Sequence, residues 1–155
     1  MSIRAAQAKD AGVLTKIAFE SKAHWGYSPE FMEACREELQ VSQDKIADGR
    51  FHFFVLEKHN RVIGFYALER LSEEEWELEA LFVTPNSMSQ GVGASLVGHA
   101  KDFATSHGVK KILIQGDPNA TGFYENQMAR QVGKRQSGSV PGRFLPLFEI
   151  VLIKL

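Results

Sequence analysis

Residues 78–96 read Leu-Glu-Ala-Leu-Phe-Val-Thr-Pro-Asn-Ser-Met-Ser-Gln-Gly-Val-Gly-Ala-Ser-Leu, and this stretch decides the fold. An apolar strand ends in a Thr-Pro turn, a polar loop follows, and Gly91 and Gly93 open a helix. The glycines let backbone amides approach an anion without a Cβ in the way, and the helix start adds unpaired N–H groups and the positive end of its dipole. This order of elements predicts a phosphate-binding loop.

Composition and charge restrict the classes of protein to consider. The chain has 155 residues and is 44% apolar, so we expect residues 1–155 to form a single globular domain. Its net charge of −1 gives no basic surface for nucleic acid or for an anionic membrane, and we expect neither as a partner. No apolar run reaches membrane-spanning length and the N-terminus lacks the apolar core of a signal peptide, so we expect a cytoplasmic location.

The residues that commonly bind metals are few and scattered. The one cysteine, Cys35, excludes a disulfide framework and a cysteine-rich zinc site, and its helical spacing from Phe31 and Leu39 favours a small buried thiol over a nucleophile. None of the five histidines lies four residues from another. We therefore expect no metal site.

Apolar periodicity predicts an α/β (α+β) fold, in which helices flank a mixed, mostly antiparallel central sheet. Ser28 and Pro29 form a helix start, Gly108 suits a left-handed helix end, and Asn60 suits a tight turn between two strands. The strand-helix-strand unit across residues 76–115 should contain a parallel or splayed pair of strands. The predicted strands are 2–6, 51–57, 61–68, 75–83, 111–115, 132–135 and 144–153. The predicted helices are 9–22, one that follows Ser28 and buries Phe31, Met32, Cys35 and Leu39, then 91–107 and 118–127.

Two common phosphate loops do not fit the glycine pair. A P-loop needs a lysine and a hydroxyl after its second glycine, and the residues after Gly93 are Ala94 and Ser95. A dinucleotide-binding fold needs a third glycine where this chain has Leu96, and an acid at the end of the next strand where it has Gln115.

The stretch resembles the acetyl-coenzyme A site of the GNAT family, the GCN5-related N-acetyltransferases. In that family a strand ending in Val-x-Pro leads into Gln/Arg-x-x-Gly-x-Gly/Ala, and the interval from Val83-Thr-Pro85 to Gly91-Val-Gly93 matches. Residues 119–124, Asn-Ala-Thr-Gly-Phe-Tyr, resemble a second signature of the family, and the element order agrees along the chain. One position departs, because Met88 stands where the family usually has Gln or Arg. We expect this difference to weaken coenzyme binding without abolishing it.

The resemblance implies an enzyme that takes acetyl-coenzyme A as co-substrate and has a splayed strand pair at the coenzyme site. Main-chain groups of Phe82 and Val83 are expected to pair with the pantetheine arm and to polarise the thioester. The full set of coenzyme-binding residues implied is Leu81, Phe82, Val83, Gln90, Gly91, Val92, Gly93, Ala94, Ser95, Asn119 and Phe123.

Acetyl transfer from a thioester to an amine needs a base for the amine and an acid for the thiolate. Tyr124 falls on the family's tyrosine position and is the candidate acid, the alternative being a core aromatic whose hydroxyl meets solvent. Glu77 and Glu79 lie two apart on a strand and should share a face with Leu81, where apolar surface and a like charge would make a better base. Glu79 is the first choice as base. The alternatives are a solvated strand face or a role in attracting a cationic substrate.

The loop 22–27 and the segment 137–143 are expected to border the acceptor site, as they do in this family. Trp25 and Tyr27 could line a pocket for a cationic or aromatic amine, or Trp25 could pack the helices against the sheet. Arg143 could meet a substrate carboxylate, or be a solvated hairpin residue. Together with Glu77, these are the candidate substrate residues.

The resulting hypothesis is an N-acetyltransferase that moves acetyl to a primary amine, with a small molecule favoured, by direct attack in a ternary complex. Two alternatives remain open: a coenzyme A-binding regulatory module with weak or lost chemistry, and an enzyme that acetylates a protein N-terminus or lysine. The family often dimerises through its last strands. A homodimer is therefore possible, and the apolar run 147–153 could be core or interface.

Overall fold

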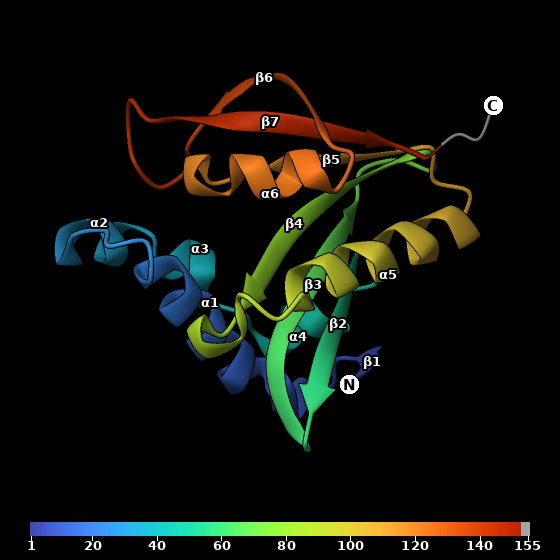
Figure 1. Cartoon of the computed structure of the whole chain (residues 1–155), viewed down its shortest axis with the longest axis horizontal. Coiled ribbons are helices and arrows are strands. Elements are labelled where there is room, and N and C mark those ends of the chain that lie inside the picture. The colour runs from blue at the N-terminus through green and yellow to red at the C-terminus, as the bar shows by residue number, and fades with distance from the viewer. Residues whose placement is uncertain (153–155) are drawn as a thin grey trace.

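The computed structural model describes residues 1–152, and these form a seven-stranded sheet with helices on both faces (Figure 1). The strand order is β1-β2-β3-β4-β5-β7-β6. The strands are β1 (Ser2–Ala5), β2 (Phe51–Lys58), β3 (Arg61–Arg70), β4 (Glu75–Val83), β5 (Lys111–Gln115), β6 (Arg130–Gln136) and β7 (Phe144–Val151). The α-helices are α1 (Ala11–Ala23), α2 (Pro29–Ala34), α3 (Arg36–Leu39), α4 (Gln43–Ala47), α5 (Val92–Ser106) and α6 (Thr121–Asn126). Three short 3₁₀ helices are η1 (Ala8–Asp10), η2 (Pro85–Ser87) and η3 (Pro118–Ala120).

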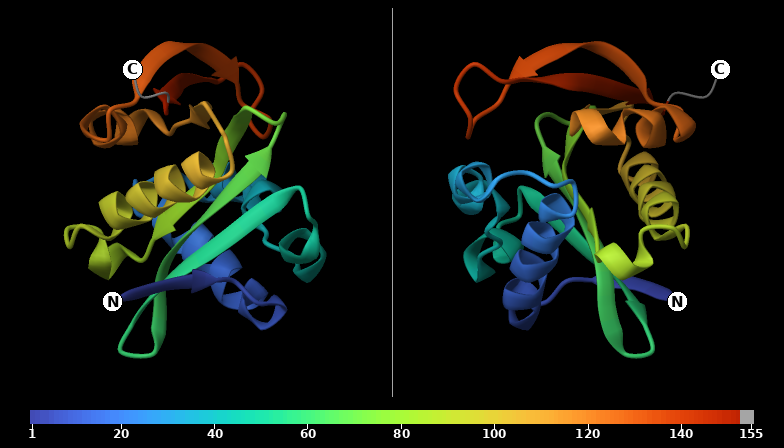
Figure 2. Two further views of the ribbon diagram at one scale, coloured as in Figure 1. Left: turned by 90° about the vertical axis from the view of Figure 1, so that its right-hand side faces the viewer. Right: turned by 60° about the vertical axis from the view of Figure 1, so that its left-hand side comes forward.

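The two faces of the sheet carry separate apolar cores. Helices α1 to α4 cover one face, whereas α5 and α6 lie on the other (Figure 2). Leu14 and Ile17 of α1 pack with Phe65 of β3 in the first core, and Leu96 of α5 packs with Phe148 of β7 in the second. Every strand pair is antiparallel except β4 with β5. The mixed, mostly antiparallel sheet expected from the sequence is confirmed.

The sheet opens between its two parallel strands. β4 and β5 pair only from Glu75 opposite Lys111 to Leu78 opposite Ile114, and β4 then continues to Val83 paired with β3 alone. Figure 1 shows the two strands diverging beyond this point. The splayed pair leaves one edge of β4 without a neighbouring strand, and the candidate functional site lies at this opening.

A β-bulge marks the point of divergence. On β3, Ala67 lies opposite Ala80 and Leu68 lies opposite Leu78, so the intervening Glu79 has no partner residue. A bulge bends its strand and increases the local twist. It therefore helps β4 to turn away from β5, and it reverses the alternation of side chains after Glu79.

Most predicted elements are present, with differences in the second helix and at the chain end. Ser28 caps α2 by accepting a hydrogen bond from the amide of Phe31, as its sequence indicates, but the helix breaks at Cys35 before α3. Helix α4, a single turn capped by Ser42, has too few apolar residues to show a period and was not predicted. The predicted last strand extended to Ile153, which lies outside the described residues.

The apolar run of β7 is core in this structure. β7 pairs with β5 on one side and β6 on the other, and Phe148 and Ile150 are buried. Strand β6, whose residues are mostly exposed, forms this edge of the sheet. Within residues 1–152, no helix has both the length and the apolar character needed to cross a membrane.

The backbone of Gly91 gives a first testable prediction. Gly91 has a φ of 75°, where a Cβ is strained, whereas Gly98 lies inside α5 with no atom within 4 Å of an added Cβ. We expect Gly91→Ala to lower the free energy of unfolding by about 1 kcal/mol and Gly98→Ala to raise it by about 0.5–1 kcal/mol. Urea denaturation measures both variants. Equal effects of the same sign would contradict this assignment of the loop backbone.

Candidate active site

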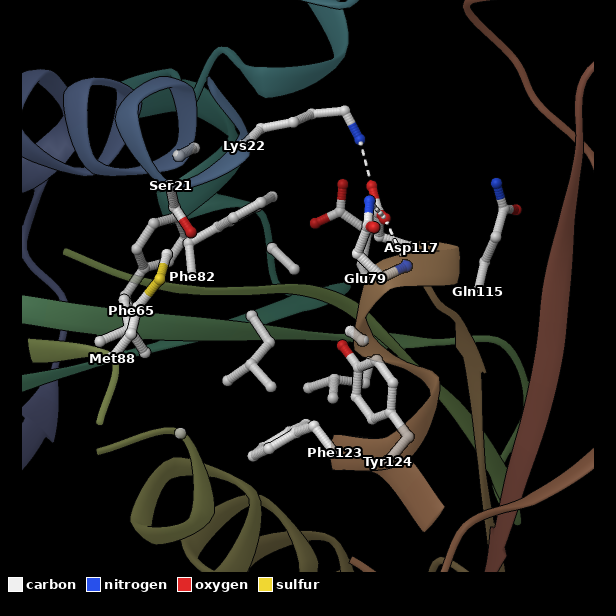
Figure 3. Close-up of a pocket in the computed structure, with 18 of the residues that line it drawn as sticks. Ser21, Lys22, Phe65, Glu79, Phe82, Met88, Gln115, Asp117, Phe123 and Tyr124 are labelled. Atoms are coloured by element: carbon white, nitrogen blue, oxygen red, sulfur yellow. Dashed lines mark hydrogen bonds and ion pairs between the residues drawn. The ribbon is translucent and has the colours of Figure 1, made fainter. Parts of the chain in front are cut away.

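A cavity of about 580 Å³ lies at the sheet opening, between α1, the end of β4, the start of α5 and the segment that leads into α6 (Figure 3). Of the residues singled out from the sequence, it is lined by Trp25, Glu77, Glu79, Leu81, Phe82, Val83, Gly91, Gly93, Ala94, Asn119, Phe123 and Tyr124. One continuous cavity therefore joins the glycine loop to the candidate catalytic residues.

The start of α5 presents unpaired amides at one end of this cavity. The first helical bond runs from the amide of Ser95 to the carbonyl of Gly91, and no backbone hydrogen bond within residues 1–152 uses the amides of residues 91–94. Gly93 is needed for packing, because an added Cβ would lie 3.1 Å from the Phe123 ring. The predicted phosphate loop thus has free donors at a helix start, which suits an anion.

Three of the six predicted loop residues do not line the cavity. Val92 is completely buried in the core, so only its main chain is available. Gln90 and Ser95 have exposed side chains, and their amides already donate to Ser87 and Gly91. Their predicted contacts with the coenzyme therefore gain no support from the cavity geometry.

The β4 main chain offers a second set of free groups, which corrects the expectation for Phe82. The amide of Thr84 donates to the carbonyl of Ile63 on β3 at 2.9 Å. Because antiparallel residues alternate between bonded and non-bonded pairs, Phe82 also bonds to β3, while the N–H and C=O groups of Leu81 and Val83 face the opening. The free main-chain groups are therefore those of Leu81 and Val83.

Tyr124, the candidate acid, lies in the cavity wall with its hydroxyl not bonded to any described residue. Its ring is buried against Phe148 and Gly116, and in Figure 3 its hydroxyl points up into the cavity towards Glu79. No hydrogen bond within residues 1–152 uses this hydroxyl. Burial, with a smaller contribution from the charge of Asp117, raises the pKa of Tyr124 above its ordinary value. The phenol is therefore protonated at neutral pH.

The two glutamates of β4 differ in their partners, and the bulge corrects their expected surroundings. Glu77 binds Arg135 of β6 at 3.0 Å, and Oε1 of Glu79 accepts a hydrogen bond from Lys45 of α4 at 2.6 Å. Leu81 does not share their face, because the bulge at Glu79 turns it towards the α5 core. Each carboxylate therefore borders a cation, and Oε2 of Glu79 accepts no hydrogen bond from a described residue.

Comparison with known proteins agrees with this geometry. The model of the "Acetyltransferase (GNAT) family" matches residues 17–129. The chain belongs to the GNAT family. It is an N-acetyltransferase and hence an acyltransferase. No significant match is found among curated protein sequences.

Solved structures share the fold of this GNAT protein. The PaiA N-acetyltransferase from Thermoplasma acidophilum, in complex with coenzyme A, has a TM-score of 0.79 at 21% identity, covering 97% of this chain and 99% of its own. The ribosomal-protein-S18-alanine N-acetyltransferase from Escherichia coli has a TM-score of 0.75 at 17% identity, covering 99% and 95%. The aminoglycoside 6'-N-acetyltransferase from Enterococcus faecium has a TM-score of 0.68 at 15% identity, covering 100% and 99%. At these identities the likeness establishes the fold alone.

The predicted acceptor residues separate into two groups in this GNAT structure. Trp25 is 44% exposed and lines the cavity, whereas Tyr27 and Arg143 are absent from its wall. The Tyr27 hydroxyl donates to Asp117 at 2.7 Å and accepts from Arg143 at 2.9 Å and from Asn119 at 3.0 Å. Tyr27 and Arg143 therefore belong to a polar network centred on Asp117, which we call the Asp117 network, and they lie on the side of Asp117 away from the cavity wall.

The sequence did not single out several residues of the wall. Lys22, at the end of α1, and Asp117, between β5 and η3, both line the cavity and form an ion pair at 3.3 Å. The Asp-Pro pair at residues 117–118 was a usable signal, since Asp117 caps η3 by accepting from the amide of Asn119. Lys22 begins the loop 22–27 that was expected to border the acceptor site, but nothing in its own type or spacing singled it out, because a lysine at a helix end is ordinarily solvated.

Two further observations concern Met88 and metal binding. Met88 is half-buried, packs against the core beneath α5 and lines the cavity beside the loop, so an apolar side chain occupies a place near the free amides. Within residues 1–152, no group of three or more His, Cys, Asp or Glu side chains is arranged to hold a metal ion.

Proposed function

We propose that this protein transfers acetyl from acetyl-coenzyme A to the primary amine of a small molecule, by direct attack in a ternary complex. The observation that carries the proposal is the continuity of one cavity. It is bordered by the free amides of α5 at one end and by Tyr124 and Glu79 further in.

The coenzyme's parts have matching groups along this cavity. Its pyrophosphate would accept from the amides of residues 91–94, which lie at the positive end of the α5 dipole. Its pantetheine amides would pair with the main-chain groups of Leu81 and Val83, much as an added strand would. Phe123 packs between the loop and the cavity and would lie beside this arm.

The catalytic step needs proton transfers at two positions. Alkyl amines are mostly protonated at neutral pH, so Oε2 of Glu79 would take a proton from the acceptor amine, directly or through water. The amine nitrogen then attacks the thioester carbon, an N–C bond forms, and the C–S bond breaks. Tyr124 would donate its proton to the departing sulfur, and the resulting phenolate would regain a proton as the new amide nitrogen loses its excess one, directly or through water.

Cys35 gives no support to a covalent acyl-enzyme. Its side chain is buried under Met32 and Leu39 and does not line the cavity. Burial also raises the pKa of the Cys35 thiol, which lowers the fraction of reactive thiolate. Direct attack by the amine needs no such nucleophile.

Hydrogen bonds between the segments around the cavity favour a small acceptor over a protein chain. The Asp117 network ties the α1–α2 loop to the segment after β5, and Arg143 adds the β6–β7 loop to it. A further hydrogen bond, from Ser139 to Glu38, joins the same β6–β7 loop to α3. An extended peptide would have to cross these joined segments.

Thermal unfolding with and without acetyl-coenzyme A, beside a coenzyme A-release assay over a panel of amines, tests the proposal. At a hundred times its dissociation constant the ligand should stabilise the protein by roughly 2.7 kcal/mol. Stabilisation with turnover is the expected result. Stabilisation without turnover of any amine would favour a regulatory coenzyme-binding module, and no stabilisation would contradict the coenzyme assignment.

A further inference from the structure

The ammonium group of Lys22 has hydrogen-bonding capacity that the described protein does not use. Its side chain is only 15% exposed, and its Nζ makes one hydrogen bond, to Oδ2 of Asp117 at 3.3 Å. An ammonium group has three N–H donors. In Figure 3 the side chain runs from α1 across the top of the cavity to Asp117, beside Glu79. The Nζ also lies 5.4 Å from the centre of the Tyr27 ring and 5.8 Å from that of Phe31. Lys22 lines the cavity, and two of its N–H donors make no hydrogen bond to a described residue.

Asp117 has little capacity left for a substrate amine. One oxygen accepts from the amide and the side chain of Asn119 at 2.9 and 2.8 Å, and the other accepts from Tyr27 and Lys22. Two lone pairs on each oxygen account for four such bonds. The carboxylate of Asp117 is therefore saturated by the protein.

A second cation shares this one carboxylate. The Arg143 guanidinium lies 3.7 Å from Oδ2 of Asp117 and 4.7 Å from the centre of the Phe31 ring, with 19% of its side chain exposed. Lys22 and Arg143 together carry two positive charges against the single negative charge of Asp117. This corner of the site thus has an excess positive charge in a poorly solvated place.

The other carboxylates of the cavity do not cancel this excess. Glu77 is neutralised by Arg135 and Glu79 by Lys45. Glu38 is exposed at the rim, where water screens its charge. A buried excess charge is costly unless a partner of opposite sign meets it.

We propose that the acceptor carries an anionic group in addition to its primary amine, and that Lys22 is the residue that binds this group. The proposal rests on the acetyltransferase function proposed above. Arg143 acts from behind the wall, adding charge without touching the acceptor. The amine then lies towards Oε2 of Glu79, and the anionic group lies towards the α1 side of the cavity. A zwitterionic amine such as an amino acid has this arrangement of charges.

Coenzyme A release with matched amines tests the proposal. β-Alanine and 2-aminoethyl phosphate present a carboxylate and a phosphate, while β-alaninamide and ethanolamine present the same primary amine without the charge; glycine and glycinamide form a shorter pair. A charge-assisted hydrogen bond predicts a kcat/KM about 10- to 100-fold higher for the anionic member of a pair. The amide's amine is the less basic of the two, so amine protonation works against this result.

Substitution at Lys22 shows whether the lysine is the cause. Lys22→Met should raise KM for the anionic acceptors about 10- to 100-fold more than KM for their neutral counterparts. Lys16→Met is the matched control, because Lys16 lies on the same helix with 73% of its side chain exposed. The stabilisation by acetyl-coenzyme A should be the same in both variants, which shows that the fold and the coenzyme site are intact.

Each outcome decides between the two proposals. A preference for either anionic acceptor that Lys22→Met abolishes supports the inference, and the better acceptor identifies carboxylate or phosphate. Equal or faster turnover of the neutral amines overturns the inference and leaves the acetyltransferase function standing. A preference that persists in Lys22→Met overturns the role of Lys22. Turnover of no amine overturns both proposals.

Discussion

Tyr124→Phe should lower kcat about 10²- to 10⁴-fold, the range that a lost general acid commonly accounts for. The change removes only the hydroxyl that points into the cavity and leaves the ring packed against Phe148 and Gly116. Because no described residue bonds to this hydroxyl, the free energy of unfolding should change little. Steady-state kinetics with acetyl-coenzyme A and an accepted amine measure the loss, and urea denaturation measures the stability.

The pH dependence of this variant tests whether Tyr124 stays protonated over the working pH range. An unperturbed tyrosine titrates at about 10, and burial raises the pKa of Tyr124 further. The phenol therefore stays protonated from about pH 6 to pH 9, and the ratio of wild-type to variant kcat should be constant over this range. A ratio that falls as the pH rises through this range would mean that the phenol loses its proton there, contrary to the burial of Tyr124.

Tyr66→Phe is the matched control, with the opposite expected pattern. Tyr66 is fully buried in β3, its hydroxyl lies 2.7 Å from Nδ1 of His99, and it does not line the cavity. Loss of the Tyr66 hydroxyl should lower the free energy of unfolding by about 1–2 kcal/mol and leave kcat unchanged. If both variants lose activity equally, the effect belongs to the fold and Tyr124 is not the acid.

Local sequence signals were enough to predict the frame of the site. The turn between β2 and β3 has positive φ at His59 and Asn60, and Gly108 ends its helix with a φ of 78°. Each of these features depends on a residue type that favours one backbone conformation. The same holds for the glycines at the start of α5. Backbone conformations that are set by the residues within a few positions can therefore be predicted from the sequence.

The bulge at Glu79 is a feature that the sequence did not predict. Alternation along a strand predicted that Glu77, Glu79 and Leu81 share a face, and the register with β3 breaks that alternation between Leu78 and Ala80. A bulge depends on the pairing of two strands, so one strand's own sequence does not reveal it. The same pairing decides that Leu81 and Val83, and not Phe82, have free main-chain groups.

The Asp117 network was missed for a related reason. Its members come from α1, the α1–α2 loop, the segment after β5 and the β6–β7 loop. Their separations along the chain reach 116 residues, and only the folded sheet brings them together. Tyr27 and Arg143 were predicted to be substrate residues from their types and their places in the chain. The structure instead joins them to Asp117, a carboxylate that no local pattern links to either residue.

Asp117→Ala should therefore lower stability more than any other substitution proposed for this protein. It removes the one carboxylate between Lys22 and Arg143, whose side chains are 15% and 19% exposed, and it leaves the Tyr27 hydroxyl without its acceptor. Removing one partner of a buried charge pair commonly costs about 3–5 kcal/mol. Urea denaturation at neutral pH measures this loss. Asp102→Ala is the control, because Asp102 is exposed on α5, and it should change stability by less than about 0.5 kcal/mol.

The stability difference between wild type and Asp117→Ala should depend on pH in a way that follows from the direction of the Asp117 pKa shift. Burial alone would raise the pKa of this carboxyl, but the hydrogen bonds from Tyr27 and Asn119 and the charge of Lys22 outweigh it, and the pKa lies below its ordinary value. A carboxyl with a lowered folded-state pKa contributes stability that is fully present above its unfolded pKa of about 3.9 and is lost as the pH falls towards the folded value. The stability difference between wild type and Asp117→Ala should therefore be constant above about pH 5 and shrink below about pH 4. A difference that grows on acidification would mean that Asp117 is protonated in the folded protein, and the charge excess at Lys22 would then be larger than the structure indicates.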